Sequence, residues 1–100
     1  MLFLVISTPL PGRPSSVTAA RKRYWKWMDP LLKSGMSRMV YARVGRGAVA
    51  LFDVDTTQTL HRLINEWSDI MPAHFEVYPL LDATTAQKYL DQHGRGKKRR

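Results

Sequence analysis

The sequence contains no cysteine, which excludes disulfide bonds, thiolate nucleophiles and cysteine-based zinc sites. It also lacks any apolar run close to the ~20 residues that a membrane-spanning helix needs. The first apolar stretch stops at Ser7 and no Lys or Arg precedes it, so the pattern of a secretory signal is missing. We therefore expect a cytoplasmic protein without a membrane segment.

Acidic residues are scarce as well: 8 Asp and Glu stand against 16 Lys and Arg, for a formal net charge of +8. Much of this charge follows Gly94, where the segment RGKKRR carries five cations and no acid. A chain of 100 residues, 44% of them hydrophobic, is sized for one core. We predict a single domain over residues 1–93 and a basic, unstructured tail over residues 94–100. The alternative role of the tail is nonspecific, salt-dependent binding of nucleic acid.

Hydrophobic periodicity divides the domain into strands and helices. Stretches rich in apolar and β-branched residues predict strands, and apolar positions spaced three or four residues apart predict helices. We predict strands at residues 2–8, 36–44, 48–54 and 74–81, and helices at residues 15–34, 59–67 and 83–93. At Asp29-Pro30 we expect an interruption of the first helix, either a kink or a fresh helical turn capped by Asp29, because proline lacks the amide hydrogen that a helix uses.

Small and polar residues mark where several of these elements begin and end. Ser15 or Ser16 is expected to cap the first helix, and Gly35 is expected to end it. The segment Gly45-Arg46-Gly47 predicts a tight hairpin between the second and third strands. These signals favour short connections and hence a compact arrangement of neighbouring elements.

The order of the elements is β-α-β-β-α-β, which predicts an α+β protein with a ferredoxin-like antiparallel sheet. The first and third strands are apolar on both faces, as expected for the two central strands of such a sheet. The two helices can cover only one sheet face. We expect a second copy of the chain to cover the other face, giving a dimeric α+β barrel.

Two stretches of the sequence resemble the muconolactone isomerase family. They are GAVALFDVDTTQTLHRL and, at a fixed spacing, FEVYPL. The resemblance implies a small dimeric α+β barrel that assembles into a larger ring. It also implies an enzyme that shifts a double bond in a small carboxylated lactone by removing one proton and returning another, with no metal or organic cofactor.

At two places the chain differs from that family. Leu4 stands where the family carries a histidine, and the first helix carries the basic run Arg21-Lys22-Arg23 where the family is rich in acids. Three hypotheses follow. The first is an isomerase that moves a proton on a small acidic cyclic metabolite of the lactone or aromatic-degradation type. The second, favoured by these differences, is a non-catalytic oligomeric barrel that binds a ligand or a protein partner. The third is a cofactor-free oxygenase of the same barrel class.

Two residues are candidates for the catalytic proton transfer. Glu76 alternates with His74 and Tyr78 on one face of the last strand, where a carboxylate in a partly dry cleft can act as a base. Its alternative role is an edge-strand salt bridge. His61 flanks the apolar stripe of the second helix, and histidine is a common proton carrier near neutral pH. Its alternative role is a surface or interface histidine.

Five residues are candidates for substrate binding. Tyr24 lies on the apolar arc of the first helix and Arg21 at the margin of that arc, while Tyr41 and Arg43 are expected on one face of the second strand. Together with Tyr78 on the last strand they could form an aromatic-walled, cationic pocket for a small carboxylate or aromatic molecule. The alternative is that the tyrosines belong to the core and the arginines to the solvated surface.

The histidines do not show the spacing of metal ligands. His61, His74 and His93 fall at unrelated positions, and no cysteine is present to complete a site. We therefore expect no metal and no cofactor, and we name a second copy of the chain and a small acidic molecule as the expected partners.

Overall fold

The computed structural model describes the backbone of residues 1–98 and the side chains of residues 1–93. Four strands, three α-helices and one turn of 3-10 helix (η1) follow each other in the predicted order. Their bounds are β1 (Leu2–Pro9), η1 (Pro14–Val17), α1 (Thr18–Ser34), β2 (Ser37–Ala42), β3 (Ala48–Asp53), α2 (Thr57–Ile70), β4 (Ala73–Leu80) and α3 (Ala83–Lys98). Within residues 1–98, no helix is both long and apolar enough to cross a membrane.

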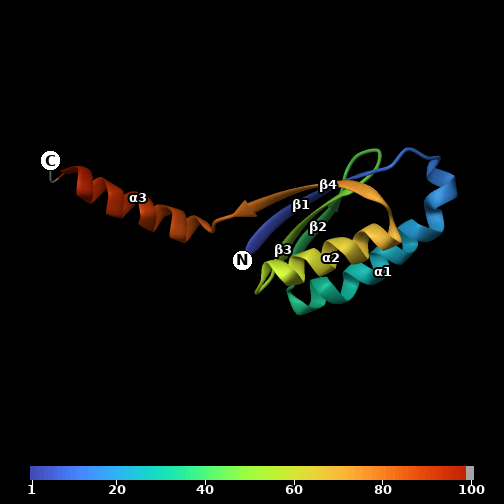
Figure 1. The fold of residues 1–100 in the computed structure, drawn as a ribbon, viewed down its shortest axis with the longest axis horizontal. Helices are drawn as coiled ribbons and strands as arrows, with labels where there is room; N and C mark the ends of the chain where they lie inside the picture. The colour runs from blue at the N-terminus through green and yellow to red at the C-terminus, as the bar shows by residue number, and fades with distance from the viewer. Residues whose placement is uncertain (99–100) are drawn as a thin grey trace.

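The four strands form one antiparallel sheet in the order β2-β3-β1-β4. The two central strands are the two that the sequence predicts to be apolar on both faces. Helices α1 and α2 lie side by side on one face of this sheet (Figure 1). The predicted α+β, ferredoxin-like fold is therefore confirmed.

The hydrophobic core fills the space between the sheet and the two helices. Alternate residues of the central strands point into it, and the largest fully buried side chain is that of Trp67 on α2. The Trp27 indole on α1 donates a hydrogen bond of 2.9 Å to Glu66 of α2, which ties the two helices together. The buried core residues are Phe3, Val5, Tyr24, Met28, Ala48, Ala50, Phe52, Val54, Leu60, Leu63 and Trp67.

The opposite face of the sheet, which we call the open face, is apolar and is covered by neither α1 nor α2. The register places Leu4 between Leu51 of β3 and Tyr78 of β4, and this pairing continues along the central strands. Side chains of the open face are half-buried or exposed: Leu2, Leu4, Ile6, Met39, Tyr41, Val49, Leu51, Tyr78 and Leu80. The second copy expected on this face stays a prediction.

Helix α1 departs from its predicted course at two points. It continues through Pro30 to Ser34, so the predicted fresh turn at Asp29 was wrong, while the predicted kink stays a prediction. Pro30 has no amide hydrogen to donate to the carbonyl of Lys26, one turn earlier. Both residues are exposed, so water can donate a hydrogen bond to that carbonyl instead. The predicted serine cap is also wrong, since η1 precedes α1 and Val17 occupies the cap position without a side-chain bond. Gly35 ends the helix as predicted, in the left-handed conformation at φ 83°.

A β-bulge shifts the faces of β2. The register against β3 slips between Ser37 and Met39, so Ser37 is buried on the helix side whereas Met39 pairs with Leu51 on the open face. A regular alternating strand would place Ser37 and Met39 on one face, and the bulge places them on opposite faces. An inserted residue of this kind leaves no clear mark in a short alternating pattern.

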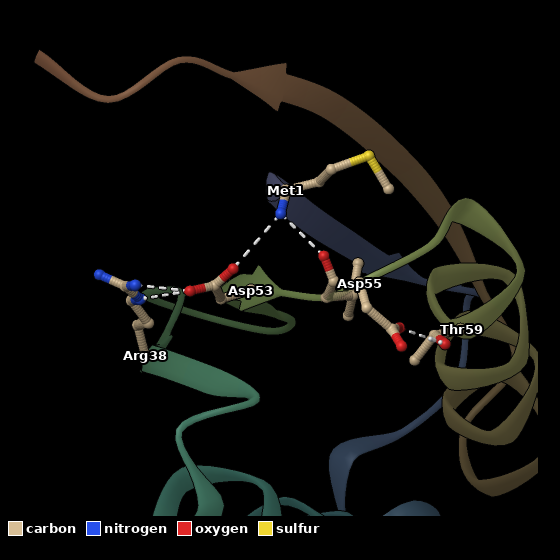
Figure 2. A network of polar contacts seen from close by, with 6 residues as sticks. Met1, Arg38, Asp53, Asp55 and Thr59 are labelled. Atoms are coloured by element: carbon tan, nitrogen blue, oxygen red, sulfur yellow. Dashed lines mark hydrogen bonds and ion pairs between the residues drawn. The ribbon is translucent and has the colours of Figure 1, made fainter. Parts of the chain in front are cut away.

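A polar network joins the ends of β1, β2 and β3 (Figure 2). Arg38 donates from Nε to the Asp53 carboxylate at 3.0 Å, and its Nη2 reaches the same oxygen. The amino group of Met1 lies 3.4 Å from the other Asp53 oxygen and donates to the Val54 carbonyl at 2.8 Å. The hydrogen bond from Arg38 is the main cause that lowers the pKa of Asp53 below its ordinary value.

Helix α3 projects from the end of β4 as an arm, away from the rest of the molecule (Figure 1). The radius of gyration is 17.5 Å, against about 13 Å for a compact domain of this length. Asp82 caps the arm by accepting from the Thr85 amide at 2.8 Å. The helix runs past its predicted end and overlaps the predicted tail of residues 94–100. The side chains of that tail lie outside the described part of the chain, so its role stays a prediction.

Candidate functional site

A small cavity opens at the end of the sheet, where the last residues of β1 meet the β2–β3 hairpin beneath α1. Its volume is about 50 Å³. We call it the arginine pocket, because three guanidinium groups belong to its wall. It is lined by Ser7, Arg21, Tyr24, Trp25, Ala42, Arg43, Arg46, Gly47, Ala48, Trp67 and Met71.

The hairpin turn sets the shape of this pocket. Gly45 and Gly47 both have positive φ, at 95° and 101°, where side chains with a Cβ are strained. At Gly47 a Cβ would also collide with the carbonyl oxygen of Ser7. The close approach of hairpin and β1 therefore requires glycine at position 47, and it brings the arginines of the hairpin to the end of β1.

The rim of the pocket carries unneutralised positive charge. The Arg43 Nη1 donates to the Ser7 carbonyl at 3.0 Å and to Thr8 Oγ1 at 2.8 Å, and Arg46 donates to two carbonyl oxygens of the loop after β1. These acceptors are neutral. Among residues 1–93, neither these two arginines nor Arg21 has a carboxylate within ion-pair distance. The rim is therefore suited to attract an anion.

The floor of the pocket is aromatic and holds one buried hydroxyl without a partner. Tyr24 is 5% exposed and packs against Trp67 and Trp25, with ring centroids 4.9 and 5.1 Å away. No hydrogen-bond partner for its hydroxyl is found among residues 1–93. Burial raises the pKa of Tyr24 well above its ordinary value, so the phenol keeps its proton at neutral pH.

A second buried hydroxyl, that of Ser7, is already occupied. It accepts from the Ala48 amide at 2.9 Å and lies 3.3 Å from the Ala48 carbonyl. Ser7 therefore contributes to holding β1 against β3. Within residues 1–93, the Tyr24 hydroxyl is the one of these two that lacks a hydrogen-bond partner.

The structure brings together three of the seven predicted site residues. Arg21, Tyr24 and Arg43 all line the arginine pocket. Tyr41 does not: it is 67% exposed and pairs with Val49 on the open face. The prediction that Tyr41 and Arg43 share a face was wrong, because β2 ends at Ala42 and Arg43 turns with the hairpin toward β1.

The other three predicted residues, Glu76, Tyr78 and His61, do not line this pocket. Glu76 and Tyr78 lie on the open face of β4, where the Tyr78 hydroxyl donates to the Glu76 carboxylate at 2.6 Å. This hydrogen bond raises the pKa of Tyr78. His61 is exposed on α2. Neither of the two predicted catalytic residues lines the arginine pocket.

The other eight lining residues were not predicted as site residues, among them the polar Arg46 and Ser7. The sequence pattern assigns Arg46 only to the hairpin turn and Ser7 only to the end of the first apolar stretch. The position of Arg46 between two glycines is the signal that could have identified it. A tight hairpin that packs against the first strand places its middle residue next to that strand. Within the described residues, no group of three acidic or histidine side chains could hold a metal ion.

The sheet order, with both helices on one face, defines an α+β protein of the muconolactone isomerase-like fold. The structure is similar to that of muconolactone isomerase, with a TM-score of 0.68 and 25% identity over 82% of this chain and 90% of that one. It is also similar to 5-chloro-2-hydroxyhydroquinone dehydrochlorinase from Burkholderia phenoliruptrix AC1100 in complex with 2,5-dihydroxybenzoquinone, with a TM-score of 0.71 and 13% identity over 85% and 98% of the two chains.

The family of the chain follows from its sequence. Residues 1–94 match the family described as a domain of unknown function, DUF3303, and the chain belongs to that family. No curated protein has a significantly similar sequence.

Proposed function

We propose that this protein binds a small, planar, acidic metabolite in the arginine pocket. The observation that carries the proposal is the set of three guanidinium groups without a carboxylate partner, placed around a cavity with an aromatic floor. Guanidinium groups form strong, directional hydrogen bonds with carboxylates, and aromatic walls favour a flat ligand. A cavity of about 50 Å³ holds only part of such a ligand, so the remainder would lie outside it.

The structural neighbours support a cyclic ligand. One neighbour is an isomerase named for a lactone, and the other was solved with 2,5-dihydroxybenzoquinone, an oxygen-substituted ring. A ring of this kind presents a flat apolar body and polar substituents at its edge. The arginine pocket offers matching surfaces for both.

The second candidate function is catalysis of a proton shift on the bound metabolite, favoured by the similarity to muconolactone isomerase. Such a reaction needs a base near the ligand carbon. No carboxylate or histidine of residues 1–93 lines the arginine pocket, and Glu76 lies on the other face of the sheet. The geometry of a single chain therefore supports binding better than it supports isomerisation.

We also propose that the functional unit is a homodimer joined through the open face. Ile6 and Leu4 lie at the centre of this face, and exposed Tyr78 and Leu80 extend it along β4. A contiguous apolar surface of this kind favours association. The matching face of a second copy would bury it symmetrically and close the two sheets into a barrel.

The binding proposal is tested by isothermal titration with benzoate, a flat carboxylate, and with benzamide, its uncharged analogue. We expect benzoate to bind and benzamide to bind at least tenfold more weakly. The Arg21→Ala variant removes a rim cation whose side chain makes no hydrogen bond to any of residues 1–93, and it should weaken benzoate binding. The matched control is Arg62→Ala, which removes an exposed arginine of α2 paired with Glu66. Equal affinity of wild type for both compounds would overturn the proposal.

A further inference from the structure

The chain has three tryptophans, and two of them have structural roles. Trp67 is buried in the core, and Trp27 donates a hydrogen bond to Glu66 that joins the two helices. Trp25 differs from both: it is 44% exposed and lines the arginine pocket. The core therefore accounts for two of the indole rings, whereas the third leaves a large aromatic surface in contact with solvent.

The neighbouring ring of Tyr24 fixes how the Trp25 indole lies. Their centroids are 5.1 Å apart and their planes meet at 73°, which is an edge-to-face contact. Tyr24 is itself buried and packs against Trp67. In an edge-to-face pair the edge of one ring meets the face of the other, so at least one face of the indole is left uncovered by this contact. Among the rings of residues 1–93, Tyr24 is the only one that pairs with Trp25.

Positive charge lies one helical turn from this indole. Arg21 and Trp25 are four residues apart on α1, so they are neighbours on one side of the helix, and both line the pocket. Arg43 lines the same pocket from the hairpin, with its guanidinium oriented by Thr8. An acid group that binds these cations therefore brings the ring attached to it close to Trp25.

The size of the cavity decides where that ring can lie. A cavity of about 50 Å³ has room for an acid group but not for a six-membered ring beside it. The ring therefore lies outside, where it needs an apolar surface to contact. Of the three aromatic residues that line the pocket, Tyr24 and Trp67 are buried and Trp25 is exposed. Trp25 is thus the lining ring that such a ligand can stack on.

We propose that Trp25 is a specificity-determining residue that stacks on the ring of the bound acid, and that the ligand class is aromatic acids as opposed to saturated ring acids. A flat delocalised ring can lie offset on the indole face, whereas a puckered saturated ring presents no π face to it. This inference rests on the proposed function, because it uses the same pocket. It adds that the arginines select the charge of the ligand and that Trp25 selects its ring.

The test compares benzoate with cyclohexanecarboxylate, a saturated ring acid of the same charge, by isothermal titration. In the wild type we expect benzoate to bind about three- to tenfold more tightly, the range for a stacked aromatic pair. In Trp25→Leu the preference should fall to about onefold, because leucine keeps an apolar surface without a π face. Tyr89→Leu is the matched control, since it removes an exposed aromatic ring that does not line the pocket.

Two further variants keep the test decisive. Trp25→Phe retains an aromatic ring at the same position and should retain part of the preference for benzoate. Trp25→Gln takes the place of Trp25→Leu if circular dichroism shows that the leucine variant does not fold, since a polar side chain suits an exposed helix position. Its preference should also fall to about onefold.

The outcomes separate this inference from the proposed function. A preference that persists in a folded variant without a ring at position 25, or that is absent from a folded Trp25→Phe, overturns the role of Trp25. Equal affinity of the wild type for both acids overturns the ligand class. All of these results leave acid binding standing, because that claim is tested by benzoate against benzamide. If neither acid binds the wild type, the proposed function fails and this inference fails with it.

Discussion

The guanidinium of Arg43 donates to the hydroxyl of Thr8 at 2.8 Å, and this contact ties the β2–β3 hairpin to the end of β1. The same nitrogen also reaches the Ser7 carbonyl. The arginine is thereby oriented by neutral acceptors, and its charge is left for a ligand at the rim of the arginine pocket. A cation held in place in this way loses little conformational freedom when an anion binds.

Replacing this cation should weaken the binding of acids. Arg43→Gln keeps a hydrogen-bond donor at the hairpin but removes the positive charge, so we expect the dissociation constant for benzoate to rise about tenfold or more. Isothermal titration at low ionic strength measures the change. Arg62→Gln, with the same charge change on α2, should leave the constant unaltered. Unchanged binding by Arg43→Gln would remove this residue from the site.

The hairpin glycines should differ in their tolerance of a side chain. Gly45→Ala introduces only the strain of a positive φ, about 1–3 kcal/mol, since no heavy atom lies within 4 Å of the added Cβ. Gly47→Ala adds a collision with the Ser7 carbonyl, so we expect a larger loss of unfolding free energy. Urea denaturation of the two variants measures the difference. Equal losses would show that hairpin and β1 are not in close contact.

Alkaline pH should destabilise the protein through Tyr24. An unfolded tyrosine releases its proton near pH ~10, whereas burial raises the pKa of Tyr24 in the fold. Release of this proton lowers the free energy of the unfolded state as the pH rises above ~10, so folding stability falls. The stability of Tyr24→Phe relative to the wild type should increase between pH 8 and pH 11, measured by denaturation at each pH. A constant difference would contradict the burial of this group.

Acid should weaken the network around Asp53. The hydrogen bond from Arg38 is the main cause that lowers the pKa of Asp53. The ionised Asp53 carboxylate therefore stabilises the fold above the pKa of an unfolded aspartate, about 3.9. This stabilisation is lost as the pH falls through the pKa that Asp53 has in the folded protein. Asp53→Asn should be less stable than the wild type at pH 7, and the difference should narrow as the pH falls below about 3.9. Asp69→Asn, an exposed control on α2, should show no such narrowing. Thermal melts across this range measure both.

The homodimer proposal predicts a mass of two chains in solution. Light scattering at tens of micromolar should give the dimer for the wild type, and Ile6→Lys should shift it toward the monomer by placing a charge at the centre of the open face. His61→Lys on the exposed surface of α2 should not. Circular dichroism checks that Ile6→Lys stays folded. A monomeric wild type would rule out this interface.

Much of the fold follows from local sequence patterns. The central strands are recognisable because β1 and β3 must be apolar on both faces, and the hairpin because Gly45 and Gly47 must adopt positive φ. The bulge in β2 was not predictable, because inserting one residue changes the facing of Ser37 without changing composition. The path of α1 through Pro30 also depends on tertiary context, since an exposed turn tolerates the missing hydrogen bond.

The site was predictable only in part. Arg21 and Tyr24 lie on one helix three residues apart, so their proximity is a local property that periodicity reveals. Arg43 joins them only through the three-dimensional contact between the hairpin and β1. For the same reason Tyr41, two residues earlier, was misassigned: the strand ends between them and the chain turns.

The account depends most on the claim that acids bind in the arginine pocket, and a nuclear magnetic resonance titration of labelled protein with 4-hydroxybenzoate tests it directly. The account predicts saturable shifts of the Trp25 indole N–H and of the Ala48 amide, with little change at Val49 and Leu51 on the open face. Shifts centred on the open face, or none at all at millimolar ligand, would contradict it.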